Sequence, residues 1–335
     1  MKNPSHWDKS DLHKHLQHAL DLELWTIPLY LTAVYSIRDL PKTKHGNFPD
    51  AAKLILSVVI QEMLHAEILW NLSNALGFSP KFHPPAYDES KGIPFIHPPK
   101  HSLPDELRGY TVKPQALNKE SLKLFCAIEM PHPRKEIDWG KESRYNAQPE
   151  LYEALRLGVA SLWDTYYVGE SNNRKQKSNF KEYHNEKGHG FSIIINSRDA
   201  ALRAIEAIIE QGEGADSKNV PADFRPHEIS DEVVLEAAWF KANLSHYQKF
   251  RILLHSYHKL PPVYKQEDTI TEQAKSANEN LRRNYANFWK VMEENFHTEG
   301  TEMTPGFWGS MWDLSNSIAA VWESGMCPDF NLDSH

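Results

Sequence analysis

Apolar residues recur at every third or fourth position through four stretches of the chain, which is the spacing of a buried helical face. These stretches are residues 10–38, 50–76, 198–212 and 231–260. Polar and charged residues fill the intervening positions, as expected for helices that pack on one side only. The pattern therefore predicts an all-α protein built around four long helices.

The remaining segments differ in character. Residues 79–196 connect the second and third predicted helices as a long crossover, and its first part is rich in proline and histidine. Within it, residues 117–129 are predicted as a short helix or strand, and residues 150–163 as a helix. Residues 270–325 carry the pattern of two more helices, rich in Trp and Phe. We expect one domain over residues 1–335, with the crossover and the C-terminal helices added to the bundle.

Composition narrows the class of protein. The 335 residues are 40% hydrophobic and 24% charged, and the formal net charge of -8 argues against a protein that binds nucleic acid or anionic membranes. Only Cys126 and Cys327 could form a disulfide, which suits a reducing compartment. The N-terminal residues 1–18 lack the apolar core of a signal peptide, and residues 54–60 are too short an apolar run to span a bilayer. The expected location is the cytoplasm.

Candidate chemistry begins with Glu62 and His65, which are three residues apart in the second helix and so share one of its faces. A Glu-x-x-His pair is a weak signal, because roughly one or two should arise by chance in a chain of this composition. A second pair, Glu294 and His297, is interpreted as such a coincidence, with Glu294 facing solvent. Glu62 and His65 are a metal-site candidate if other helices bring matching ligands.

Glu23 is the first such residue. It falls inside the apolar stripe of the first helix, flanked by Leu22, Leu24 and Trp25. A buried acid is costly without a partner, so it either pairs with a basic side chain or binds a metal ion. The desolvation argument favours a metal ligand.

The third and fourth helices offer further ligands. Glu210 and Glu213 lie on one edge of the third helix, although a charged edge is usually a solvated face. His246 lies on the mixed face of the fourth, where a lone histidine is more often a core residue than a ligand. Four helices with these residues nevertheless match the dimetal bundle plan, in which two helices each give a Glu and two each give Glu-x-x-His.

At this point the sequence resembles a known family, the ferritin-like domain of iminophenyl-pyruvate dimer synthases, found in bisindole biosynthesis. The resemblance covers nearly the whole chain and is carried by residues 19–23, 26–31, 61–65, 71–80, 125–131, 210–215 and 244–247 with Phe250. It implies a ferritin-like four-helix bundle with a carboxylate-rich metal centre. Its order of motifs is more specific for the fold than for the substrate.

One position departs from the dimetal plan. The residue three before His246 is Asn243, where a glutamate is expected. An amide oxygen is a weaker ligand for a divalent ion than a carboxylate. Three outcomes stay open: an asymmetric dimetal centre with Glu213 compensating, a single ion, or a site without catalytic function.

The leading hypothesis is a non-haem iron oxidase or oxygenase that uses O2, with one or two iron ions and manganese as the alternative metal. The resemblance implies an imine or amino-acid-derived substrate in secondary metabolism, and oxidative dimerisation is its most specific form. The competing hypothesis is a ferritin-like metal-binding protein without organic turnover. Small-molecule substrate and O2 are the expected partners, with no nucleic acid and no membrane, and a homo-oligomer is left open.

The roles in this hypothesis are assigned as follows. The metal ligands are Glu23, Glu62, His65, Glu210 and His246. Glu129 and Glu213 are candidates for an additional ligand or a catalytic proton relay. Trp25 and Tyr30 are candidates for the substrate pocket, with ordinary core packing as the alternative.

Overall fold

The computed structural model describes residues 2–87, 92–96, 109–131, 139, 145, 147–180, 194–212 and 244–332. In this part of the chain the regular secondary structure is helical, which confirms the all-α prediction. The α-helices are α1 (Lys9–Tyr35), α2 (Asp50–Ala75), α3 (Lys119–Ile128), α4 (Gln148–Tyr166), α5 (Arg198–Gly212), α7 (His246–His255), α8 (Glu272–His297) and α9 (Pro305–Glu323). Short 3-10 helices cover Pro4–His6, Leu40–Lys42, His45–Asn47, Glu170–Asn172 and Tyr257–Lys259.

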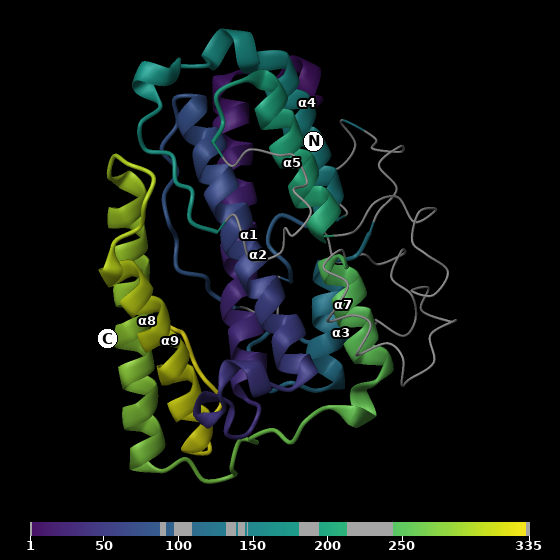
Figure 1. Ribbon diagram of the computed structural model, residues 1–335. Helices are drawn as coiled ribbons and strands as arrows, with labels where there is room; N and C mark the ends of the chain where they lie inside the picture. The colour runs from purple at the N-terminus through teal and green to yellow at the C-terminus, as the bar shows by residue number, and fades with distance from the viewer. Residues whose placement is uncertain are drawn as a thin grey trace.

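The α1–α2 hairpin is the centre of the molecule. Each helix is buried over most of its length, because the hairpin is covered on more than one side (Figure 1). α1 starts with a capping box, in which Asp8 accepts from the backbone of Asp11 and Asp11 accepts from the backbone of Asp8. Both helices were expected at nearly these bounds.

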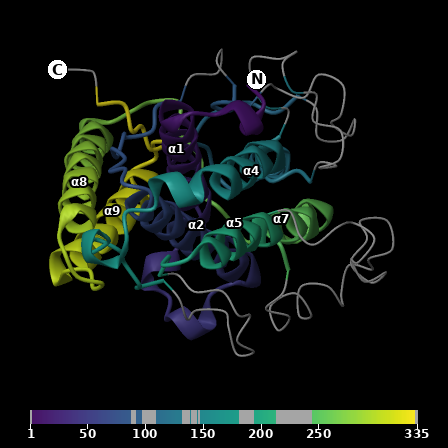
Figure 2. The ribbon, with the colours of Figure 1, turned by 90° about the horizontal axis from the view of Figure 1, so that it is seen from above.

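The second half of the bundle is divided. α4 and α5 pack against each other beside one part of the α1–α2 hairpin, and α3 and α7 pack against each other beside the other part (Figure 1, Figure 2). A regular four-helix bundle has one pair of long helices here, and this protein has two pairs of shorter helices in their place. The predicted crossover, residues 79–196, contains α3 and α4, and so it supplies part of the bundle rather than an addition to it.

The fourth predicted helix, residues 231–260, is shorter in the described residues than expected. α7 begins at His246, with Ser245 as its N-cap in a capping box with Gln248. Only residues from 244 onward are described here, so the earlier part of the prediction lies outside the described residues.

The two predicted C-terminal helices are α8 and α9, which form a hairpin beside the bundle (Figure 1). α9 packs against α1, and the indole of Trp322 donates a 2.9 Å hydrogen bond to the carbonyl of Thr32. In the described part of the chain, none of the helices is long and apolar enough to cross a membrane.

Candidate metal centre

A first group of atoms that could bind a metal ion lies between α1 and α2. The Nδ1 of His65 is 2.9 Å from Oε2 of Glu23 and 3.8 Å from Oε2 of Glu62. Glu62 and His65 share a face because they are three residues apart in α2, and Glu23 enters from the buried stretch of α1. All three side chains are buried, as the sequence pattern predicts for this face.

A second group lies beside the first. The Nδ1 of His246, at the first residue of α7, is 3.0 Å from Oε1 of Glu62 and 3.6 Å from Oε2 of Glu129. Glu129 is the C-cap of α3 and was expected as a ligand or proton relay. The second group therefore draws on two helix ends as well as on α2.

Glu62 belongs to both groups, one oxygen facing each histidine. In each group the ligand atoms lie within 4.8 Å of one another, and every side chain is buried. The rings of His65 and His246 are stacked with centroids 5.3 Å apart. Together the two groups contain three carboxylates, of which Glu62 is shared, and two imidazoles. This set could hold metal ions, and it has one carboxylate fewer than the dimetal bundle plan.

The three carboxyl groups are buried close together, and this shifts their pKa values. Burial raises the pKa of Glu62 well above its usual range, and the charges of Glu23 and Glu129 raise it further. Burial also raises the pKa of Glu129, to about 7, although the hydrogen bond from Tyr30 opposes the shift. Burial alone would raise the pKa of Glu23, but the charge and hydrogen bond of His65 outweigh it and hold that pKa at about 2. Without a cation, the acids cannot all be ionised together.

Two tyrosines orient the outer carboxylates. Tyr152 on α4 donates a short hydrogen bond to Oε1 of Glu23, and Tyr30 on α1 donates one of 2.5 Å to Oε1 of Glu129. The hydroxyl group of each phenol therefore contacts one oxygen of its carboxylate. The other oxygen of Glu129 is the one that faces His246.

Two glutamines contact the outer nitrogens of the histidines. The Nε2 of His65 is 2.9 Å from Oε1 of Gln211, and the Nε2 of His246 is 3.2 Å from Oε1 of Gln61. The Nζ of Lys249 donates to the same oxygen of Gln61 at 2.6 Å. Burial lowers the pKa of Lys249 to about 7, although the charges of Glu62 and Glu129 oppose the shift.

A narrow cavity of about 10 Å³ adjoins the first group, which is about the space of a single water molecule. It opens between the start of α4 and the end of α5. Its lining consists of Glu23, His65, Glu129, Gln148, Pro149, Tyr152, Ile208, Ile209 and Gly212.

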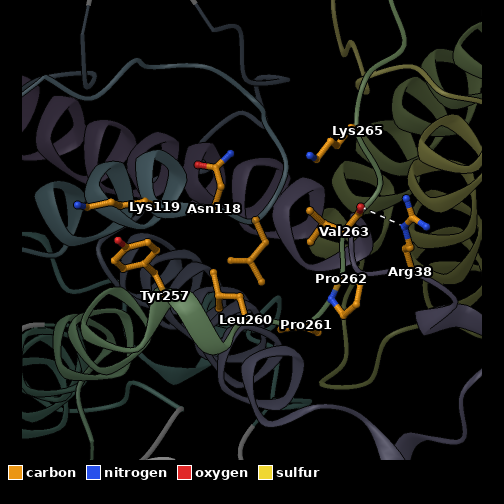
Figure 3. A pocket seen from close by; sticks show the side chains of 10 residues that line it. Arg38, Asn118, Lys119, Tyr257, Leu260, Pro261, Pro262, Val263 and Lys265 are labelled. Carbon is orange, nitrogen blue, oxygen red and sulfur yellow. Dashed lines mark hydrogen bonds between the residues drawn. The ribbon is translucent and has the colours of Figure 1, made fainter. Parts of the chain in front are cut away.

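A larger cavity of about 410 Å³ lies away from the carboxylates, where Tyr257 and Lys119 face Arg38 and Lys265 across a floor of apolar residues (Figure 3). The Nε of Arg38 donates a 3.2 Å hydrogen bond to the carbonyl of Val263 there. This cavity shares no lining residue with the narrow one. The candidate site is thus identified by its chemistry and not by cavity size.

The predicted ligand Glu210 needs correction. Its side chain is exposed and takes part in neither group. The buried face of α5 runs through Ala204 and Ile208, and its next positions are Gln211 and Gly212, so Glu210 faces the opposite side. Gln211 is the residue of α5 that contacts His65.

The two aromatic residues predicted for a substrate pocket lie in different places. Tyr30 lies at the site, whereas Trp25 packs on Tyr87 with ring centroids 5.4 Å apart and donates to the carbonyl of Ala86, away from the narrow cavity. Glu213 and Asn243 lie outside the described residues, so their roles stay predictions.

The Glu294 and His297 pair was interpreted as a coincidence. Glu294 is exposed and lies 3.9 Å from Lys290, and His297 lies 3.9 Å from Glu293. Neither residue joins a metal-ligand group among the described residues.

Four residues at the site were missed: Gln61, Tyr152, Gln211 and Lys249. Gln61 directly precedes Glu62, and Gln211 continues the apolar stripe of α5, so both carried a positional signal. Tyr152 occupies a buried position of a correctly predicted helix, but nothing in its surroundings indicates that a carboxylate lies opposite. Lys249 follows His246 by three residues, which on a helix indicates a shared face.

Comparison with known proteins agrees with the fold. The profile of the family described as Ferritin-like matches residues 16–255. The structure is similar to the crystal structure of a ferritin like protein from Caulobacter vibrioides, with a TM-score of 0.74 and 27% sequence identity, over 97% of this chain and 99% of that one. A comparison with curated proteins finds none that matches.

Proposed function

The chain belongs to the ferritin-like family, and from this premise we propose that it is a dinuclear non-haem iron enzyme that uses O2. Glu23, Glu62 and His65 would hold one ion, and Glu62, Glu129 and His246 the other. The observation that carries the proposal is the position of Glu62, whose two oxygens face different histidines.

The residues fit a pair of divalent cations. Glu23, Glu62 and Glu129 are buried within one cluster, and unpaired buried carboxylates are costly. Lys249 is buried nearby but donates to Gln61 instead of to a carboxylate. Two divalent ions would supply the missing positive charge, and a carboxylate-rich set with two imidazoles suits iron or manganese.

When bound, iron would supply the capacity to reduce O2, and the protein would orient the ligands and limit the access of water. Tyr30 and Tyr152 hold Glu129 and Glu23 in fixed rotamers through their hydroxyl groups. Ile208 and Ile209 line the narrow cavity with apolar surface, which limits the access of water. Burial raises the pKa of Glu129 to about 7 in the metal-free protein, so an ion that binds this carboxylate would displace a proton near neutral pH.

The proposed substrate is an amino-acid-derived imine, and oxidative dimerisation is the most specific form of the reaction. This part of the proposal is supported by the resemblance to iminophenyl-pyruvate dimer synthases. The narrow cavity has room for a water-sized molecule, so an organic substrate would have to approach at its mouth, between α4 and α5.

Metal content is the first test. We expect purified protein to contain about two iron ions per chain by elemental analysis, as the two groups require. Glu62→Ala should remove both ions and His65→Ala one. Glu294→Ala removes an exposed glutamate that has the same sequence spacing from a histidine, so it is the matched control and should retain both. Folded wild-type protein that binds no metal would overturn the proposal.

O2 consumption is the second test, measured with a panel of aromatic 2-imino and 2-amino acids. We expect consumption that depends on iron, on substrate and on Glu62. Iron-loaded protein that consumes no O2 with any member of the panel would favour the metal-binding alternative without organic turnover.

A further inference from the structure

A short chain of hydrogen bonds reaches the candidate ligand His246 on the side away from the carboxylates, and each donor and acceptor in it can be identified. It runs from Lys249 through Gln61 to His246. Lys249 Nζ lies 2.6 Å from Gln61 Oε1, and His246 Nε2 lies 3.2 Å from the same oxygen. All three side chains are buried, so water does not compete for these contacts.

The first link orients the amide of Gln61. An ammonium group has three donors and no acceptor, so the amide atom that faces Lys249 must be the oxygen. The oxygen and nitrogen of a glutamine amide are assigned from their hydrogen-bond partners, and a lysine that can only donate requires the oxygen. Oε1 of Gln61 is therefore the atom that faces His246.

The second link sets the tautomer of His246. An amide oxygen only accepts hydrogen bonds, so the hydrogen bond between Gln61 and His246 requires a hydrogen on Nε2 of the imidazole. In the neutral ring Nδ1 then carries the lone pair, and Nδ1 is the atom that faces Glu62 at 3.0 Å and Glu129 at 3.6 Å. A metal ion binds the imidazole nitrogen that has no hydrogen.

We propose that Lys249 and Gln61 are positioning residues, which hold His246 in the tautomer that presents Nδ1 to the second metal group. The consequence for metal binding rests on the proposed function, whereas the tautomer is a property of the metal-free protein. His65 provides an internal comparison, because its outer nitrogen contacts Gln211 and not this chain.

The test uses full-length protein labelled with ¹⁵N-histidine. Two-bond ¹H–¹⁵N correlation spectra of the metal-free protein just below neutral pH, where Lys249 keeps its ammonium form, distinguish the two ring nitrogens, and His246→Asn identifies the signals. We expect wild-type His246 to carry its hydrogen on Nε2. In Lys249→Met the amide of Gln61 is free to rotate, so the other tautomer should become populated while the His65 signals stay in place.

Two substitutions of Gln61 test the same proposal in case Lys249→Met does not fold. A carboxylate can only accept, so Gln61→Glu should keep the wild-type tautomer, whereas Gln61→Leu should lose it. Cobalt(II) titration in the His65→Ala background, where the second group alone remains, should show a roughly 10- to 100-fold loss of affinity for Lys249→Met and Gln61→Leu but not for Gln61→Glu.

A hydrogen on Nδ1 in the wild type would overturn the proposal, as would an unchanged tautomer in both Lys249→Met and Gln61→Leu. A failure of the wild type to bind cobalt would overturn the proposed function instead, and the spectra would still test the tautomer.

Discussion

The hydroxyl of Tyr30 donates a 2.5 Å hydrogen bond to Oε1 of Glu129, a residue 99 positions further along the chain. Both side chains are buried. The contact joins the C-terminal part of α1 to the end of α3, and it leaves the other oxygen of Glu129 facing His246.

Tyr30→Phe should weaken the second metal group selectively. The substitution removes the donor and leaves a buried carboxylate oxygen without it, so Glu129 loses its fixed orientation. In the His65→Ala background, we expect the affinity for cobalt(II) to fall by roughly 10-fold.

Tyr152→Phe is the matched control for that experiment. It makes the same chemical change, but its hydroxyl contacts Glu23, which belongs to the first group only. It should leave the affinity of the second group nearly unchanged in the His65→Ala background. Equal losses from the two tyrosine variants would contradict separate metal groups.

The shared position of Glu62 predicts a characteristic set of stoichiometries. His65→Ala and His246→Ala should each bind one ion, since each removes a ligand that belongs to a single group. Glu62→Ala should bind neither ion tightly. Elemental analysis after dialysis measures the content, and circular dichroism checks the fold. A Glu62→Ala protein with one tightly bound ion would show that the glutamate is not shared.

Gly158→Ala should destabilise the protein without touching the metal groups. A Cβ at position 158 would overlap the indole of Trp7, which is buried between the N-terminal turn and α4. Overpacking of this kind costs about 1–3 kcal/mol. Chemical denaturation should show this loss, and metal content should be unchanged. Gly46→Ala, where a Cβ meets no neighbour, is the control.

The pH dependence of stability should reflect His18. Burial lowers the pKa of this imidazole from 6.5 to about 4 in the folded protein, and its ring stacks on Phe95 with centroids 4.0 Å apart. Between these two pH values the unfolded chain takes up a proton that the folded protein does not, so stability falls as the pH falls through that window.

His18→Phe should therefore make stability less dependent on pH between about 6.5 and 4 while keeping the stacked ring. Thermal unfolding across the window measures the effect. Some acid sensitivity should remain, because burial also lowers the pKa values of His13 and His15. His6→Asn, at an exposed position, should leave the curve as in the wild type, and a His18→Phe curve parallel to the wild type would refute the assignment.

The sequence pattern was sufficient for the α1–α2 hairpin and for the buried positions of its candidate ligands. Both helices are long, and a buried charge inside an apolar stripe is visible without a structure, as Glu23, Glu62 and His65 show. Such a residue is constrained locally, since its own neighbours on the helix already place it in the core.

The part of the bundle formed by α3, α4, α5 and α7 could not be predicted in the same way. Glu129 and His246 lie at helix ends, where periodicity stops and cannot say which way a side chain points. Glu210 was chosen for its charge, although the stripe of α5 leads to Gln211 instead. The contacts that decide these positions join residues more than a hundred positions apart, and no local pattern encodes them.

The candidate ligands also differ in the stiffness of the backbone that carries them. Glu23, Glu62 and His65 stand in the interiors of α1 and α2, where any backbone shift would break several helical hydrogen bonds. Glu129 and His246 stand at the end of α3 and the start of α7, where the backbone can adjust at little cost. The candidate ligands of the first group therefore all stand on rigid backbone, whereas the second group combines the rigidly held Glu62 with two side chains whose backbone can adjust.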